Sequence, residues 1–216
     1  MELLIKLILS YLLGSVSGSM LMGKLKGVDI REMGSGNSGG TNAFRTMGIV
    51  FALVVLCIDL LKGVIAVKFL PCLNMGSILT TNLINREELL HILCGIGVVM
   101  GHVYPIYHGF KGGKGAGTMV GVLAVLFPTS LYICLPIWLV VLIFSGYVGL
   151  STMAAVIALP ICTTMFYSNG LYSHFGWFSI LIAVFIIYAH RSNIRRMMAG
   201  NENRFEKIMI FRRTKN

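Results

Sequence analysis

Apolar runs separated by short polar segments are the dominant pattern of this 216-residue chain. Runs of about 20 apolar residues are typical of helices that span a membrane, and the strict period of two found in membrane β-barrels is absent. The pattern therefore predicts an all-α fold, an integral membrane bundle of several helices. The runs are roughly Leu3–Met22, Ile49–Leu70, Leu89–Tyr107, Ala116–Phe127, Ser130–Phe144, Tyr147–Tyr167 and Phe175–Tyr188.

The stretch from Gly115 to Ala189 contains no Asp, Glu, Lys or Arg, so charge does not mark the ends of its helices. Turn signals divide this stretch at Phe127–Ser130, which contains a proline, and at Ser145-Gly146. The apolar pieces beside these turns are short for complete spans. We therefore expect the fourth and fifth helices to form a hairpin that crosses the membrane incompletely.

Lys and Arg residues gather in three segments, which are Lys24–Met47, His108–Lys114 and the tail that starts at Arg191. Cytoplasmic loops of membrane proteins are rich in these residues, so we expect all three segments in the cytoplasm. One span precedes the first segment, two spans separate the first segment from the second, and four spans separate the second segment from the tail. Together they give about seven transmembrane helices. The N-terminus is then outside and the C-terminus cytoplasmic. A count of five, with residues 116–144 re-entrant, satisfies the same parity and stays open.

The composition agrees with a membrane protein, because only 12% of the residues are charged, 56% are hydrophobic and the mean hydropathy is +0.82. The net charge of +10 could suggest nucleic acid. The positive residues flank apolar runs, however, so we expect them to face anionic lipid, with no nucleic-acid partner. We expect one membrane domain over residues 1–216. The five cysteines form no C-x-x-C pair, and we predict neither a disulfide nor a metal site.

The first polar segment, Gly34–Arg45, combines glycines with Ser, Asn and Thr side chains. Such a loop can turn backbone N–H groups toward an anion, and its arginine suits phosphate or carboxylate. Residues 34–39 fit G-x-G-x-x-G, but no β-α-β unit surrounds them, so we discount a dinucleotide site. A flexible linker is the alternative, although a linker does not require Asn37, Asn42 and Arg45 together.

The second polar segment runs from Gly101 to Thr118 and places glycines and lysines immediately before a helix. Helix N-termini bind anions through their backbone N–H groups, so this segment is similar to a phosphate cradle. It is not a Walker A loop, because Lys114 is followed by Gly115 and position 108 is a histidine. A basic turn that only sets the topology is the alternative, and it does not explain the glycines.

The third polar segment, His190–Glu202, continues the last apolar run into the cytoplasm. His190, Asn193 and Arg196 recur at every third position, so they can share one helix face. An arginine-rich membrane anchor is the alternative, and it leaves His190 and Asn193 unexplained.

Polar residues inside the apolar runs form a further group. Asp59 and Lys62 lie in the second run, three residues apart. A lone charge there costs about 3 kcal/mol, so we expect the two to neutralise each other. Whether they bind substrate or brace the bundle stays open. Thr152 lies in a later run, where a hydroxyl often bonds its own helix.

Three anion-binding segments with neither a Ser-His-Asp order nor a metal-ligand cluster predict an enzyme that binds an activated donor and orients an acceptor. The strings GSGNSGGTNAFR, GHVYPIYHGFKGGKGAGT and HRSNIRRMMAGNE, at residues 34–45, 101–118 and 190–202, closely resemble the three signature motifs of the bacterial membrane acyl-phosphate:glycerol-3-phosphate acyltransferases, the PlsY family. The resemblance implies transfer of an acyl group from acyl phosphate to the 1-hydroxyl of glycerol 3-phosphate. The products are lysophosphatidic acid and phosphate. This reaction is the first committed step of bacterial phospholipid synthesis.

The resemblance also implies a set of site residues and a place in the cell. The reaction needs no cofactor, and the partners are the two substrates, the lipid bilayer and the enzyme that makes acyl phosphate. The protein is expected in the bacterial cytoplasmic membrane with its active site facing the cytoplasm. The residues implied in catalysis are Ser35, Arg45, Lys114, His190 and Asn193. Those implied in binding the substrates or their phosphates are Asn37, Thr41, Asn42, Lys111, Gly112, Gly113, Gly115, Thr152 and Glu202.

The chain departs from the family pattern at a few positions. Ser38 replaces the usual Pro or apolar residue, Gly40 replaces Ala, and Gly117 stands where Ala is common. Gly146 stands where a basic residue often precedes Tyr147, which puts one phosphate contact in doubt. A membrane transporter of a small phosphorylated anion is the alternative function, motivated by the intramembrane charges.

Overall fold

The computed structural model describes residues 2–73 and 84–210, and over these residues it contains helices and no strand. This confirms the prediction of an all-α fold. The helices form two compact units that divide between Phe127 and Pro128, and we describe each by itself. The expectation of one domain over residues 1–216 stays a prediction.

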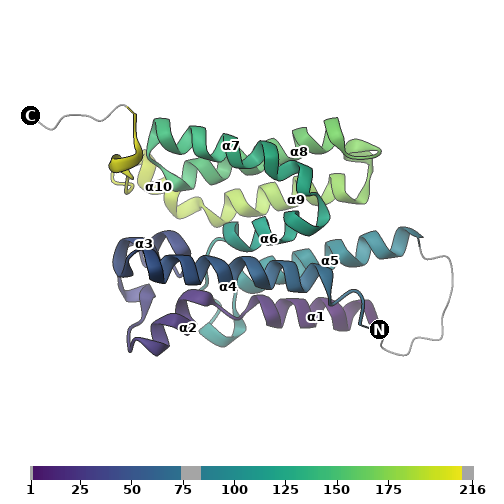
Figure 1. Ribbon diagram of the computed structural model, residues 1–216, viewed down its shortest axis with the longest axis horizontal. Helices are drawn as coiled ribbons and strands as arrows, with labels where there is room; N and C mark the ends of the chain where they lie inside the picture. Colours follow the sequence, from purple (N-terminus) through teal and green to yellow (C-terminus); the bar gives the residue numbers. More distant parts are fainter. Residues whose placement is uncertain (1, 74–83, 211–216) are drawn as a thin grey trace, which may run out of the picture. The chain divides into compact units, whose positions relative to one another are not determined.

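In the first unit, α1, α4 and α5 pack along one another and α6 packs on α4 (Figure 1). Valines fill the centre of this bundle, and the side chains of Val55, Val67, Val98 and Val122 are fully buried. The elements are α1 (Glu2–Gly14), α2 (Gly18–Leu25), η1 (Ile30–Glu32), α3 (Gly40–Met47), α4 (Ile49–Lys68), α5 (Ile84–Val103), η2 (Ile106–His108) and α6 (Ala116–Leu126).

Glycines spaced four residues apart bring the backbones of these helices close together. Gly97 and Gly101 face α1, and a Cβ atom on Gly101 would lie 2.1 Å from a backbone carbonyl oxygen of α1. Gly117 and Gly121 face α4, and a Cβ atom on Gly121 would lie 2.1 Å from a carbonyl oxygen of α4. Small residues at this spacing are how membrane helices pack tightly without a hydrophobic driving force. Both helices that flank the second polar segment are therefore fixed by close contacts.

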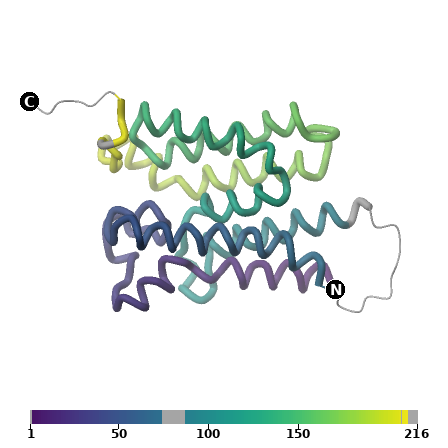
Figure 2. The backbone as a smooth tube through the Cα atoms, in the orientation of Figure 1, coloured from purple at the N-terminus to yellow at the C-terminus, as the bar shows by residue number. Residues whose placement is uncertain are grey.

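The first apolar run, which we expected as one helix, is broken. Residues 15–17 separate α1 from α2, and the axes of the two helices differ by 42° (Figure 2). Ser17 favours the break, because its Oγ accepts a hydrogen bond from the N–H of Met20 and caps the start of α2. A similar bend of 52° separates α9 from α10 in the second unit.

In the second unit, α8 packs between α7 and α9. Phe175 and Phe178 are buried in it, and the ring of Tyr167 stacks on that of Phe175 with 4.7 Å between ring centroids. Pro128 is the first residue of α7, a position that suits its fixed φ, so the turn expected over Phe127–Ser130 is shorter than predicted. The elements are α7 (Pro128–Ser145), α8 (Val148–Phe166), η3 (Gly170–Tyr172), α9 (His174–Ala189), α10 (Arg191–Met198) and η4 (Glu206–Ile208).

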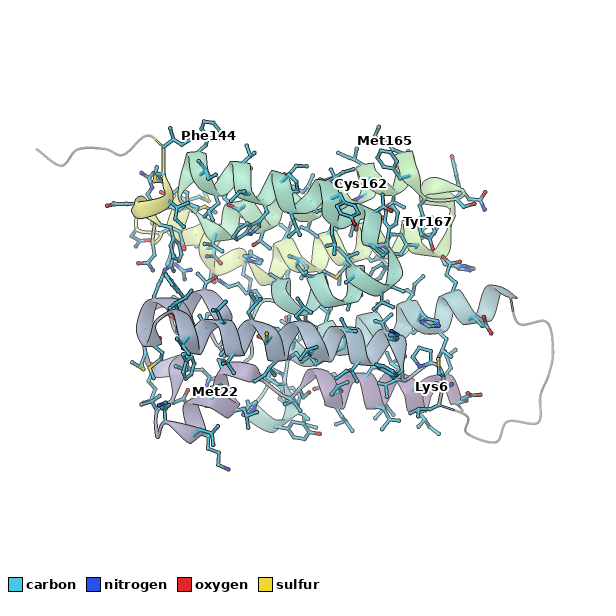
Figure 3. All side chains as sticks on the ribbon, in the orientation of Figure 1. Lys6, Met22, Phe144, Cys162, Met165 and Tyr167 are labelled. Atoms are coloured by element: carbon cyan, nitrogen blue, oxygen red, sulfur yellow. The ribbon has the colours of Figure 1, made fainter. Side chains whose placement is uncertain are left out.

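Large apolar side chains cover the outsides of the long helices, as a lipid-facing surface requires. Val50, Tyr132 and Met165 are all more than 60% exposed, and Met165 points outward from α8 (Figure 3). Four helical segments within the described residues are long and apolar enough to span a membrane alone, and each bent pair could add one span. With 11 residues, α6 is only about 16 Å long, shorter than the hydrocarbon core.

Candidate active site

The buried amide of Asn42 organises the first polar segment. Its Oδ1 accepts hydrogen bonds from the N–H of Ser35, at 2.8 Å, and from the Ser35 hydroxyl, at 3.2 Å. Its Nδ2 donates to the carbonyl oxygens of Ile30, at 3.1 Å, and Met33, at 2.9 Å. Gly34 has a φ of +57°, and a Cβ atom there would lie 2.4 Å from Asn42 Oδ1. Asn42 therefore holds the loop that precedes α3, and it needs glycine at position 34.

The other predicted residues of this segment lie around that anchor. Thr41 and Arg45 are one helical turn apart on α3, so they share a face, and both are half-buried. Ser35 and Asn37 are also half-buried, in the loop before α3. The structure thus brings the hydroxyl, amide and guanidinium groups expected in this segment onto one loop and the first two turns of one helix.

The second polar segment folds back over the end of α5. The N–H of Gly112 donates to the carbonyl oxygen of Val103 at 3.2 Å, and the N–H of Gly113 donates to that of His102 at 3.1 Å. A Cβ atom on Gly113 would lie 2.1 Å from His102 Nε2. These two N–H groups therefore satisfy carbonyls of α5, and the glycines shape the loop. The segment also carries Lys111 and Lys114, and α6 starts directly after Gly115.

The first and second segments meet in the first unit. Arg31 donates from Nη1 to the carbonyl oxygen of His108 at 3.0 Å and forms an ion pair with Asp29, with 2.7 Å between Nη2 and Oδ2. Hydrogen bonds from Arg31 hold the pKa of the Asp29 carboxyl below its usual value. A cavity of about 360 Å³ lies between the segments. Its lining consists of Asp29, Arg31, Glu32, Gly36, Lys111 and Gly112.

Of these lining residues, Lys111 and Gly112 were predicted from the sequence. Arg31 was predicted only as a residue that sets the topology, and Asp29 and Glu32 were not predicted. The available signal was the close spacing of Asp29, Arg31 and Glu32 just before the glycine-rich loop. A charged cavity of this size between two glycine-bearing loops suits a small, polar, phosphorylated molecule.

Asp59 and Lys62 of α4 are buried and paired. Asp59 Oδ1 lies 3.1 Å from Lys62 Nζ and 3.4 Å from His102 Nδ1. Lys62 also donates to the carbonyl oxygens of Gly14, at 2.9 Å, and Val16, at 2.8 Å. The expected neutralisation of Asp59 by Lys62 is confirmed. Within the described residues, the three N–H groups of the Lys62 ammonium have protein acceptors, which favours bracing over substrate binding.

The third polar segment is built in the second unit. His190 Nδ1 lies 2.8 Å from the carbonyl oxygen of Ile186; since a carbonyl only accepts, this nitrogen carries a proton. In the neutral imidazole the Nε2 atom is then the acceptor, which can take a hydrogen bond from a hydroxyl group. Asn193 donates to Glu202 Oε1 at 3.1 Å, and Arg196 Nε lies 2.7 Å from Glu202 Oε2. Glu202 therefore ties the chain after α10 to α10 itself.

The start of α8 contacts the third segment and the tail. A Cβ atom on Gly149 would lie 2.8 Å from Asn193 Nδ2, so the two helices approach closely there. Gly146 has a φ of +73°, and the Arg204 guanidinium stacks on the neighbouring Tyr147 ring at 4.6 Å. Arg204 thus brings a cation beside the position where the family pattern led us to expect a basic side chain.

Thr152 uses its hydroxyl inside the second unit. The Oγ1 atom donates to the carbonyl oxygen of Val148 in the preceding turn at 2.9 Å. It also lies 3.3 Å from Nε1 of Trp138, which donates to it. These contacts match the own-helix bond that we expected of a threonine in a span.

The comparisons with known proteins agree with this chemistry. The sequence model of the family described as glycerol-3-phosphate acyltransferase matches residues 4–200. A glycerol-3-phosphate acyltransferase of Chlorobaculum tepidum is 38% identical over 92% of this chain and 94% of its own length. One of Chlorobium luteolum is 39% identical over 94% of this chain and 97% of its own length.

Solved structures give the same result. The crystal structure of PlsY, an integral membrane glycerol 3-phosphate acyltransferase, in its glycerol 3-phosphate form matches with a TM-score of 0.79 and 33% identity. The match covers 95% of this chain and 96% of that one. The lysophosphatidic acid form matches with a TM-score of 0.77. The fold is thus that of an integral membrane acyltransferase. The chain belongs to the glycerol-3-phosphate acyltransferase family.

Proposed function

We propose that this chain transfers an acyl group from acyl phosphate to the 1-hydroxyl of sn-glycerol 3-phosphate, giving lysophosphatidic acid and inorganic phosphate. The hydroxyl oxygen attacks the acyl carbon, the bond from that carbon to the phosphate oxygen breaks, and the hydroxyl proton passes to the departing phosphate. Because acyl phosphate is a mixed anhydride, the enzyme needs to supply position and charge rather than a nucleophile.

The observation that carries this proposal is the charged cavity between the first and second segments. Lys111 and Arg31, which is also paired with Asp29, line a cavity of about 360 Å³, large enough for glycerol 3-phosphate. The carboxylates of Asp29 and Glu32 in the same lining are acceptors for hydroxyl groups. A transporter of a phosphorylated anion, the alternative considered above, receives no support from the relatives.

Most of the predicted site residues keep their roles in this proposal, while Asn42, Gly112 and Gly113, predicted to bind phosphate, are reassigned. Those in the first unit bind phosphate: Ser35, Asn37, Thr41 and Arg45 from the first segment, and Lys111, Lys114 and Gly115 from the second. Asn42, Gly112 and Gly113 shape the loops that carry these groups. In the second unit His190 and Asn193 orient the acceptor hydroxyl, Glu202 holds Asn193, and Thr152 contributes a hydroxyl.

We further propose seven membrane helices, or five if residues 116–144 are re-entrant, with the N-terminus outside and the C-terminus in the cytoplasm. We also propose a place in the bacterial cytoplasmic membrane, with the polar segments facing the cytoplasm. The enzyme that makes acyl phosphate is the partner that this donor requires. Cysteine labelling from either side of intact cells, at positions 2 and 203, tests the orientation.

The test of the reaction is a comparison of donors. Purified protein in detergent receives labelled glycerol 3-phosphate with palmitoyl phosphate, palmitoyl-CoA or palmitoyl acyl carrier protein in separate reactions. We expect lysophosphatidic acid only with palmitoyl phosphate. Product formed only from the two thioesters would overturn the donor assignment. Uptake of glycerol 3-phosphate by proteoliposomes that lack any donor would favour the transporter.

A further inference from the structure

The break between α1 and α2 leaves backbone groups that a continuous helix would pair. The carbonyl oxygens of Gly14 and Val16 and the N–H of Gly18 lack the bonds that an uninterrupted helix would give them. In an apolar environment each such group needs another partner. The break is therefore stable only if other side chains satisfy these groups.

Asp59 and Lys62 of α4 provide those partners. Lys62 Nζ donates to the oxygens of Gly14, at 2.9 Å, and Val16, at 2.8 Å. The N–H of Gly18 lies 3.4 Å from Asp59 Oδ1, which also faces Lys62 at 3.1 Å. Asp59 and Lys62 are each only 3% exposed. The ion pair thus takes the place of one helical turn of hydrogen bonds.

His102 connects the same cluster to the second polar segment. Its Nδ1 atom lies 3.4 Å from Asp59 Oδ1, and within the described residues this nitrogen has no closer hydrogen-bond partner. Its Nε2 lies directly beside Gly113, where a Cβ atom would approach it to 2.1 Å. The position of the imidazole therefore limits where the loop around Gly113 can lie.

The first and second segments are both attached to the broken helix itself. The Ser15 hydroxyl accepts a hydrogen bond from the N–H of Ile106 in the second segment at 3.3 Å. The Ser19 hydroxyl donates to the carbonyl oxygen of Ser38 in the first segment at 2.5 Å. A shift of the break would move both loops together.

We propose that Asp59, Lys62 and His102 are positioning residues that set the first and second polar segments for binding of the phosphorylated substrates. They touch the break and the loops rather than the substrate. The inference rests on the proposed function, because it assigns the binding of phosphorylated substrates to these two segments. For Asp59 and Lys62, which could either bind substrate or brace the bundle, the inference favours bracing. This bracing then affects substrate binding through the position of the two loops.

The experiment compares two buried lysines of the first unit. Lys62→Met removes the bonds to the break, whereas Lys6→Met removes a second buried pair, in which Lys6 Nζ lies 2.6 Å from Glu2 Oε1 and 2.7 Å from the Pro71 oxygen. Lys6 lies at the far end of α1 from Met22 of α2 (Figure 3). Removing one partner of a buried pair destabilises the fold in either case. A merely structural loss lowers the amount of active protein and leaves KM unchanged.

We expect Lys62→Met to raise KM for glycerol 3-phosphate between about tenfold and a hundredfold, the loss that misplaced binding groups cause. Lys6→Met lowers the melting temperature without changing KM. The double variant Asp59→Asn with Lys62→Met removes the unpaired charge but keeps the raised KM, because the break stays unsatisfied. His102→Asn, which keeps a nitrogen near Asp59, changes KM less than the similarly sized His102→Leu.

Unchanged KM in Lys62→Met, or an equal rise in Lys6→Met, would overturn the positioning role while the proposed function stands. An inactive wild type with palmitoyl phosphate would instead overturn the proposed function. In that event, calorimetric binding of glycerol 3-phosphate to the same two lysine variants still decides the inference. Weaker binding only in Lys62→Met supports it, and equal binding in both contradicts it.

Discussion

The amide of Asn42 offers the sharpest test of how the first polar segment is held. Asn42→Ala removes four hydrogen bonds to three residues of the preceding loop, from a side chain that is 1% exposed. Each bond contributes about 0.5–1.5 kcal/mol, and water can reach part of the loop once the amide is gone. Four such bonds sum to about 2–6 kcal/mol, and we expect the free energy of unfolding to fall by about 2–4 kcal/mol, the lower part of that range.

Asn42→Asp distinguishes the contribution of the amide oxygen from that of the amide nitrogen. It retains the oxygen that accepts from Ser35 but places a carboxylate oxygen where Nδ2 now donates, 3.1 Å and 2.9 Å from the carbonyl oxygens of Ile30 and Met33. These contacts become repulsive, and the charge lies in a segment expected to bind phosphate. We expect Asn42→Asp to destabilise the protein and to weaken binding of glycerol 3-phosphate more than Asn42→Ala does.

The assay pairs the apparent melting temperature in detergent with KM for glycerol 3-phosphate. Asn37→Ala, in the same loop, is the matched control: its side chain is half-buried, so we expect a raised KM with an almost unchanged melting temperature. If Asn42→Ala melts like the wild type and keeps its KM, the loop does not depend on this amide and the reasoning fails.

Other predictions concern the charge of Lys114, the helix contact at Gly121 and the attachment of the tail by Glu202. Lys114→Met should lower kcat/KM by about a hundredfold or more, as loss of a group that stabilises developing charge does; near-normal turnover would remove Lys114 from the site. Gly121→Ala should cost about 1–3 kcal/mol in a melting assay, since the added methyl group meets a backbone carbonyl, while Gly117→Ala, which faces a movable side chain, should cost much less. Glu202→Gln should speed trypsin cleavage in the tail, because it removes the ion pair with α10, and the exposed Glu206→Gln should not.

The helices were predictable because the apolar runs are long and the sequence changes character sharply at their ends. The break at residues 15–17 was not, since Ser15 and Ser17 are weak breakers inside a membrane span. What makes the break possible is Lys62, more than 40 residues later in the chain. A pattern read along the chain cannot show that a lysine elsewhere will satisfy two carbonyls.

The chemistry of the polar segments was predictable in kind but not in detail. Glycines and lysines before a helix indicated an anion cradle, yet the N–H groups of Gly112 and Gly113 bond to carbonyls of α5. Spacing cannot show which carbonyls a loop will close upon. Arg31 and Asp29 were missed as cavity-lining residues for a related reason, because a basic residue beside a span has an ordinary explanation in topology.

The second segment illustrates how a membrane enzyme can hold a flexible, glycine-rich loop in place. The helix before it is locked to α1 at Gly97 and Gly101, and the helix after it is locked to α4 at Gly121. Since side chains that face lipid gain nothing from associating with each other, these backbone contacts must supply the rigidity that a hydrophobic core gives a soluble protein. The loop between two fixed ends then has few conformations to lose when an anion binds. It follows that substitutions at Gly97, Gly101 and Gly121 should raise KM for phosphorylated substrates even though none of the three lines the cavity.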